Sequence, residues 1–171
     1  CTYISWAASY WCNEINLVSI IGDDFPEEEV RILQKRGVSV EGLVRVKDKK
    51  SFYWSGKYHN DMNNRDTLVT DLNVLAEFDP VLPESYKTSQ YIMLGNLTPS
   101  VQQSVLNQLV GKPKVVVLDT MNYWMDVALD ELYEVLRKVD VLTINDEEAR
   151  QLSGERSLVK AANKIHSFGP K

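Results

Sequence analysis

The chain has 171 residues, the size of one ordinary domain. Its hydrophobic fraction of 44% and charged fraction of 25% are close to the globular average, so disorder is not the default expectation. The formal net charge of −5 argues against a nucleic-acid-binding protein, which would need a basic stripe on its surface.

The first 22 residues predict a helix followed by a strand. Apolar residues recur at helical spacing over residues 2–12, and the run INLVSII at 15–21 predicts a strand. Cys1 and Cys12 match neither a disulfide framework nor a zinc motif, which favours a reducing cytoplasm. The segment opens on apolar residues without an initiator Met, so we expect an upstream part to be missing. Its start lacks the pattern of a signal peptide, so we expect none, and no apolar run in the sequence is long enough to span a bilayer.

Residues 26–36 predict the next helix. Asp24 and Glu27 resemble a capping box at its start, and Gly37 is placed to close it. The glutamates of its first turn and the basic residues of its last turn suit the helix dipole.

A change of pattern over residues 40–72 predicts a small β lid. Residues 40–46 and 51–58 predict two strands around a polar turn, and 67–72 predict a further strand. Aromatic residues gather here, and they serve either cross-strand packing or the covering of a substrate ring: Phe52, Tyr53, Trp54 and Tyr58.

After Pro83 strands and helices alternate. Residues 91–94, 115–118 and 141–144 predict buried strands, separated and followed by helices. Alternation with short loops implies an α/β fold: a doubly wound, mostly parallel sheet flanked by helices. We therefore assign residues 1–39 and 73–171 to an α/β core.

Polar residues follow each predicted strand of this core. In doubly wound sheets ligands bind outside the carboxyl ends of the strands, so these residues could hold hydroxyls, Mg²⁺ or phosphate. Turns are polar in any case, and Asn145 with Glu148 also has the spacing of a capping box; the two roles are compatible. The candidates are Asn96, Asp119, Asn122, Asn145 and Glu148.

Taken in order, these segments resemble the ribokinase-like, PfkB-type carbohydrate kinases over nearly the whole chain. Ser5 and Gly22 fit the opening signature of the family, whereas Tyr3 and Cys12 depart from it. The run Gly-Asp-Asp-Phe at 22–25 resembles the segment that leads into the family's lid, with Pro26 in place of a glycine. The segment from Asp119 to Asn122, followed by Trp124, resembles a sheet-edge motif of one bacterial subgroup. The segment from Asn145 to Glu148 resembles the Asn-x-x-Glu motif linked to magnesium and phosphate.

The resemblance implies an ATP-dependent kinase that transfers the γ-phosphoryl group to a hydroxyl of a small sugar or nucleoside. Asn145 and Glu148 would serve Mg²⁺ and phosphate, and Asn96, Asp119 and Asn122 the substrate. Phe52 and Trp54 would belong to the lid. The Asp119 segment lacks the Arg of members that act on acid sugars, which favours a neutral substrate.

The same resemblance implies that this chain lacks the catalytic base, because the family's Gly-Ala-Gly-Asp motif is absent from it. No catalytic residue is therefore assigned within the chain, and we expect the chain alone to be inactive. The exposed lid strands suggest a homodimer paired through the lid. The alternative from another class is a non-catalytic α/β module for small-molecule binding or assembly.

Overall fold

The structure is a computed structural model and describes residues 2–60 and 65–171. The chain divides into two compact units, Cys1–Pro80 and Val81–Lys171. Each unit is an arrangement of parallel strands with helices, and the two are described in turn. In the part of the chain that the structure describes, no helix has the length and apolar character needed to cross a membrane.

The first unit begins with a β-α-β arrangement. Helix α1 (Thr2–Ala8) precedes strand β1 (Ile15–Gly22), and helix α2 (Glu27–Lys35) connects β1 to the parallel strand β2 (Val38–Val46). Gly37, directly after the C-cap residue Arg36 of α2, has a φ of 83°, which confirms the predicted helix stop. Leu17, Leu33 and Val38 form the buried contact between the helix and the two strands.

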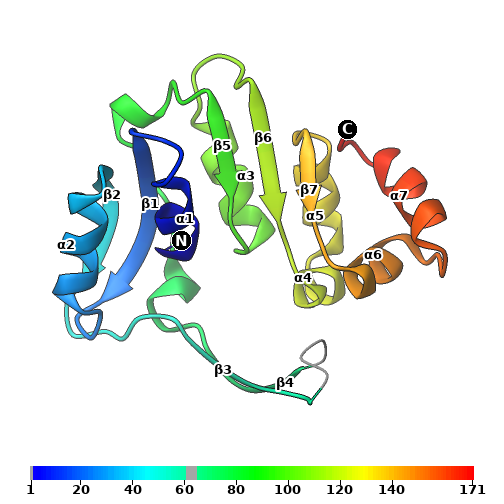
Figure 1. The fold of residues 1–171 in the computed structure, drawn as a ribbon, viewed down its shortest axis with the longest axis horizontal. Helices are drawn as coiled ribbons and strands as arrows, with labels where there is room; N and C mark the ends of the chain where they lie inside the picture. The colour runs from blue at the N-terminus through cyan, green and yellow to red at the C-terminus, as the bar shows by residue number, and fades with distance from the viewer. Residues whose placement is uncertain (1, 61–64) are drawn as a thin grey trace. The chain divides into compact units, whose positions relative to one another are not determined.

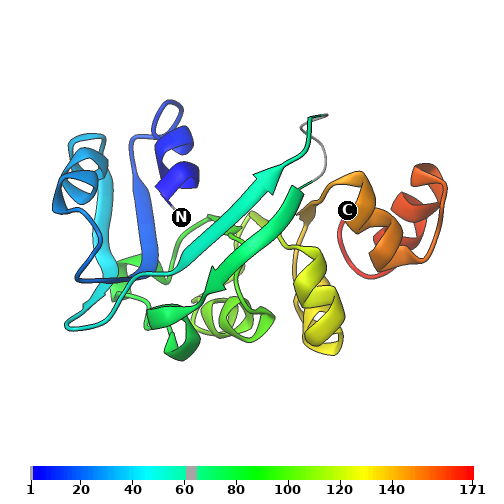
Figure 2. The same ribbon diagram turned by 90° about the horizontal axis from the view of Figure 1, so that it is seen from below.

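A two-stranded antiparallel hairpin follows in the first unit. Strands β3 (Tyr53–Tyr58) and β4 (Arg65–Asp71) form it, and a 3-10 helix at Asn73–Glu77 comes next (Figure 2). The hairpin forms its own sheet, separate from the β1–β2 pair.

The two strands predicted at 40–46 and 51–58 are present as β2 and β3, but they do not pair with each other. Residues 38–46 pair with β1 instead, because the α2 crossover returns the chain parallel to it. The hairpin therefore starts at Tyr53, and the lid boundary predicted at residue 40 cuts through β2. Whether 1–39 and 73–171 form one core stays a prediction.

The loop between β2 and β3 is held by the residues that end β1. The N–H of Gly22 donates to Oγ of Ser51 at 2.9 Å, and the N–H of Ser51 donates to Oδ1 of Asp24 at 2.7 Å. Oδ2 of Asp23 accepts from the N–H of Asp48 at 2.6 Å. The predicted capping role of Asp24 is wrong: Pro26 precedes α2 without a side-chain cap, because the Asp24 carboxylate is used by Ser51.

The second unit contains a three-stranded parallel sheet in the order β5-β6-β7 (Figure 1). The strands are β5 (Tyr91–Leu94), β6 (Val115–Asp119) and β7 (Val141–Thr143), which confirms the three predicted strands. A 3-10 helix at Glu84–Tyr86 precedes the sheet. The helices are α3 (Pro99–Asn107), α4 (Asn122–Val127), α5 (Leu129–Leu136), α6 (Asp146–Ser153) and α7 (Leu158–His166).

The core of the second unit lies between β6 and α5. Leu118, Leu132, Val135 and Leu136 have no exposed surface. Burying a leucine or valine side chain contributes about 1.5–3 kcal/mol, so this cluster anchors the strand whose end carries Asp119.

Candidate functional site

The register of the second sheet brings the polar strand ends to one edge. Leu94 pairs with Leu118, and Asp119 pairs with Thr143. Because all three strands are parallel, the residues that follow them lie at the same edge of the sheet. Of the sequence-predicted residues, Asp119 is the last residue of β6, and Asn96 and Asn145 come two residues after the ends of β5 and β7.

A buried amide joins two of these strand ends. Nε2 of Gln102, in α3, donates to the backbone oxygens of Gly95 at 2.8 Å and of Asp119 at 3.2 Å. The Gln102 side chain is 2% exposed, and its Oε1 has no partner among the described residues. Thr120, directly after Asp119, likewise buries an unpartnered hydroxyl. The sequence carries no signal for Gln102, because a polar residue on a helix is normally expected to face solvent.

Asp119 is the partly buried carboxylate of the edge. Burial raises the pKa of its carboxyl above the ordinary value of 3.8, while hydrogen bonds from the backbone N–H groups of Asn96 and Thr120 act in the opposite direction. A carboxylate with this exposure can still accept a hydrogen bond from outside the chain.

Two asparagine amides of the site are held by neighbouring side chains. Nε1 of Trp124 donates to Oδ1 of Asn96 at 2.8 Å. Nδ2 of Asn122 donates to Oε1 of Gln151, and Nε2 of Gln151 donates to Oδ1 of Asp126 at 2.8 Å. Helix α4 thus supplies Asn122, Trp124 and Asp126 within six residues.

Asn145 and Glu148 form the predicted capping box at the start of α6. The N–H of Glu148 donates to Oδ1 of Asn145, and the N–H of Asn145 donates to Oε2 of Glu148, both at 2.9 Å. Glu148 is 5% exposed. Glycine at 154 ends the helix with a φ of 70°.

The side-chain oxygen atoms at the start of α6 could bind Mg²⁺ only if the ion kept part of its shell of water molecules. Within the described residues, no group of three or more His, Cys, Asp or Glu side chains could hold a metal by itself. The capping box uses Oδ1 of Asn145 and Oε2 of Glu148, which leaves Oε1 of Glu148. Mg²⁺ commonly retains waters and phosphate oxygens and takes one or two carboxylates, so this donor set suits it.

The predicted lid residues lie at the start of the hairpin, within the first unit. Phe52 is 44% exposed, and Trp54 is half-buried against the backbone of Gly56. That they cover a substrate stays a prediction.

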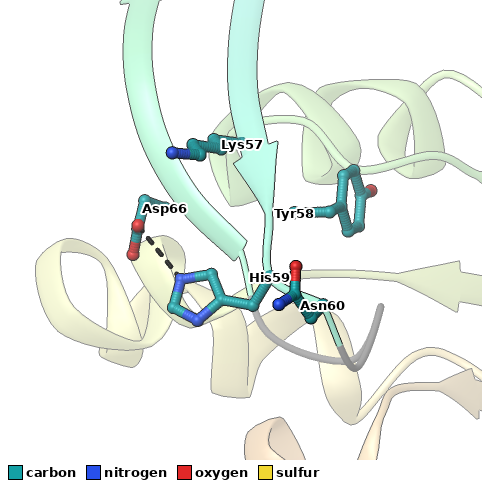
Figure 3. A pocket seen from close by; sticks show the side chains of 5 residues that line it. All are labelled: Lys57, Tyr58, His59, Asn60 and Asp66. Atoms are coloured by element: carbon teal, nitrogen blue, oxygen red, sulfur yellow. Dashed lines mark ion pairs between the residues drawn. The ribbon is translucent and has the colours of Figure 1, made fainter.

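An open hollow lies at the other end of the hairpin. Lys57, Tyr58, His59, Asn60 and Asp66 line it, and Nε2 of His59 pairs with Oδ2 of Asp66 at 3.0 Å (Figure 3). Of the residues that the sequence analysis singles out, only the hairpin aromatic Tyr58 lines it. Residues 61–64 connect the two strands there and lie outside the described residues, so we assign no site to this hollow.

Comparison with protein families decides the assignment of the chain. The family model for pfkB family carbohydrate kinases matches residues 4–171. The chain belongs to this family. A cytidine kinase of Thermococcus kodakarensis is 27% identical over 161 residues, which cover 92% of this chain and 56% of that protein.

Solved structures agree on the fold of this pfkB-family chain. A putative ribokinase II from E. coli, in complex with ATP and Mg²⁺, superposes with a TM-score of 0.75 at 16% identity, over 99% of this chain and 58% of that one. A nucleoside kinase of Burkholderia thailandensis, in complex with inosine, gives a TM-score of 0.71 at 12% identity, over 97% of this chain and 53% of that one. The fold is ribokinase-like, as predicted, and the chain spans little more than half the length of these relatives.

Proposed function

We propose that the protein containing this chain transfers the γ-phosphoryl group of ATP to a hydroxyl of a neutral sugar or nucleoside. The observation that carries the proposal is the set of amide and carboxylate groups at one edge of the second sheet, in a chain of the pfkB family. Support for a nucleoside comes from the cytidine kinase relative and the inosine-bound nucleoside kinase.

In this proposal the strand-end residues divide between two tasks. Asn96, Asp119 and Asn122 bind and orient the hydroxyl groups of the substrate. Asn145 and Glu148 hold the phosphate side, where Oε1 of Glu148 would contact hydrated Mg²⁺. The ion, when bound, neutralises charge on the transferred phosphoryl group; positioning supplies most of the remaining catalysis in phosphoryl transfer.

The proposal includes ATP and Mg²⁺ as the nucleotide and the metal, as in the complex of the E. coli relative. It assigns no catalytic base within this chain, so the isolated chain is proposed to be inactive. A cytoplasmic location and a homodimer paired through the lid belong to the same proposal. The exposed apolar side chains of the hairpin support the dimer: Tyr53, Tyr58, Leu68 and Val69.

A substrate panel tests the proposed function. The complete protein that contains this chain is incubated with ATP, Mg²⁺ and one compound at a time: cytidine, inosine, adenosine, ribose, fructose, or the acid sugar gluconate. The expected product is a phosphomonoester of a neutral compound, identified by mass. A phosphorylated gluconate with every neutral compound untouched would overturn the assignment of substrate class.

A further inference from the structure

The side-chain amides of Asn96 and Asn122 are engaged in opposite senses: Asn96 accepts through its oxygen, and Asn122 donates through its nitrogen. Each amide has one acceptor oxygen and one donor nitrogen, so a hydrogen bond that uses one of them decides which remains for a ligand. The contacts of helix α4 determine this choice at both residues. The argument rests on the proposed function, because it treats the strand edge as the substrate site.

At Asn96 the determining group is an indole. The Nε1–H of Trp124 can only donate, so the Asn96 atom at 2.8 Å from it must be the oxygen. The backbone N–H of Asn96 is also engaged, with the carboxylate of Asp119. The side-chain NH₂ of Asn96 has no partner among the described residues, and it remains as a donor.

At Asn122 the determining group is the carboxylate of Asp126, which acts through the side chain of Gln151. Asp126 in its ionised form only accepts, so Gln151 must turn its NH₂ towards Asp126 at 2.8 Å. Oε1 of Gln151 then faces Asn122 and accepts from its Nδ2. Oδ1 of Asn122 has no hydrogen-bond partner among the described residues, and it remains as an acceptor.

We infer that Trp124 and Gln151 are positioning residues that give the substrate site a fixed hydrogen-bond polarity. Asn96 offers a donor, whereas Asn122 and Asp119 offer acceptors. This arrangement suits a ligand with at least two hydroxyl groups: one accepts from Asn96, and another donates to Asn122 or Asp119. A polyhydroxy ring such as that of ribose, free or within a nucleoside, has this character.

A pair of substitutions at Gln151 separates polarity from packing. Gln151→Glu is made together with Asp126→Asn, because its carboxylate would otherwise lie against the carboxylate of Asp126. The new carboxylate then accepts from the amide nitrogen introduced at position 126 and from Nδ2 of Asn122, so the acceptor facing the ligand is retained in this double variant. In Gln151→Lys the ammonium only donates and pairs with Asp126, so Asn122 must turn its oxygen away from the ligand. Position 151 is exposed, so both side chains are accommodated there.

The measurement is steady-state kinetics of the complete protein with ATP and whichever neutral compound of the panel it phosphorylates. For Gln151→Lys we expect KM for that compound to rise about fivefold to tenfold, the equivalent of one hydrogen bond, with kcat within about twofold. For the double variant we expect KM within about twofold of the unsubstituted protein. Trp124→Phe removes the N–H and should raise KM by a similar factor, whereas the neighbouring Tyr123→Phe serves as its control.

Deoxyfluoro analogues of the same compound give a second readout, since fluorine accepts weakly but cannot donate. The hydroxyl that accepts from Asn96 should tolerate replacement by fluorine, whereas the hydroxyl that donates to Asn122 should not. In Gln151→Lys, fluorine at this second position should no longer raise KM. Equal KM values for Gln151→Lys and the double variant, with the unsubstituted protein active, would overturn the inference and leave the proposed function standing. If the unsubstituted protein phosphorylates no neutral compound, the proposed function fails first, and the inference with it.

Discussion

Asn145 and Glu148 each accept the backbone N–H of the other, at 2.9 Å in both directions. The same two residues carry the proposed contact with phosphate and Mg²⁺. A structural role and a functional role therefore coincide in one pair, and substitutions that preserve only the first can separate them.

Glu148→Gln should spare the fold and impair the reaction. A glutamine at this position still accepts from the N–H of Asn145, so the cap is kept. The charge that would contact hydrated Mg²⁺ is lost. We expect a melting temperature within about 2 °C of the unsubstituted protein, because the cap changes by well under 1 kcal/mol. Turnover of the complete protein at limiting magnesium should fall about tenfold or more, as for a lost interaction of roughly 1.4 kcal/mol.

Asn145→Ala provides the comparison for that variant. It removes the cap and should cost about 1 kcal/mol, or about 2–4 °C in melting temperature for a chain of this size. Unchanged turnover of Glu148→Gln at limiting magnesium would leave Glu148 as a helix cap alone.

Asp119→Asn should stabilise the chain at neutral pH. Burial raises the pKa of this carboxyl, so the folded state favours the protonated form. A raised pKa contributes stability at low pH that is lost as the pH rises through the folded-state pKa. The asparagine variant avoids this loss and still accepts from the N–H of Asn96. Melting temperatures from pH 3 to pH 7 should therefore converge in acid and diverge in favour of the variant towards neutrality.

The sign of that pH dependence is the test. A variant less stable than the unsubstituted chain at pH 7 would show that the ionised carboxylate is a net stabilising group. Such a result would argue against the view that the ionised carboxylate of Asp119 is kept for function at a cost to the stability of the fold.

Gly22→Ala should destabilise the chain through its backbone neighbours. A Cβ at this position would lie 2.2 Å from the backbone oxygen of Lys49 and 2.7 Å from the N of Ser51. The loop that leads into the hairpin would have to move, with a loss of about 1–3 kcal/mol by analogy with overpacked interiors. Chemical denaturation gives the free energy of unfolding.

The matched control for Gly22 is Gly111→Ala. Gly111 has a φ of 81° and open space around it, so only the left-handed backbone opposes an alanine there. That strain costs about 1–2 kcal/mol. If Gly22→Ala proved neutral, the packing of the β1 end against the loop at 49–51 would be contradicted.

Gln102→Leu should destabilise the second unit, although it replaces a polar residue by an apolar one. It removes the donor shared by the backbone oxygens of Gly95 and Asp119, and leaving buried acceptors unpaired costs about 1–3 kcal/mol. Gln103→Leu, at the next and half-buried position of α3, should change stability less, because no backbone oxygen of a strand end loses a donor there. Equal stabilities of the two variants, measured by denaturation, would argue against the bracing role of Gln102.

The elements of the second unit followed from local patterns. Uninterrupted apolar runs predicted β5, β6 and β7, and the Asn145–Glu148 spacing predicted the cap of α6. Their agreement with the structure reflects signals that lie within a few neighbouring residues. The polar strand ends followed in turn, because parallel strands bring their carboxyl ends to one edge.

The mispredictions involve contacts between residues far apart in the sequence. Asp24 resembles a helix cap locally, but its carboxylate accepts from Ser51, 27 residues later. Strand β2 has the pattern of a hairpin partner for the next strand, yet it pairs with β1 across the α2 crossover. The roles of Gln102 and Gln151 depend on partners from other elements, which spacing along the chain cannot reveal.

The measurement that tests the central claim most directly is ATP-to-ADP conversion with Mg²⁺ and the panel of neutral sugars and nucleosides. The complete protein that contains this chain and the 171-residue chain itself are assayed side by side. The account predicts compound-dependent ADP formation by the complete protein, with a matching phosphomonoester, and none by the isolated chain. ADP formation that no neutral compound stimulates, or substrate-dependent turnover by the isolated chain, would contradict it.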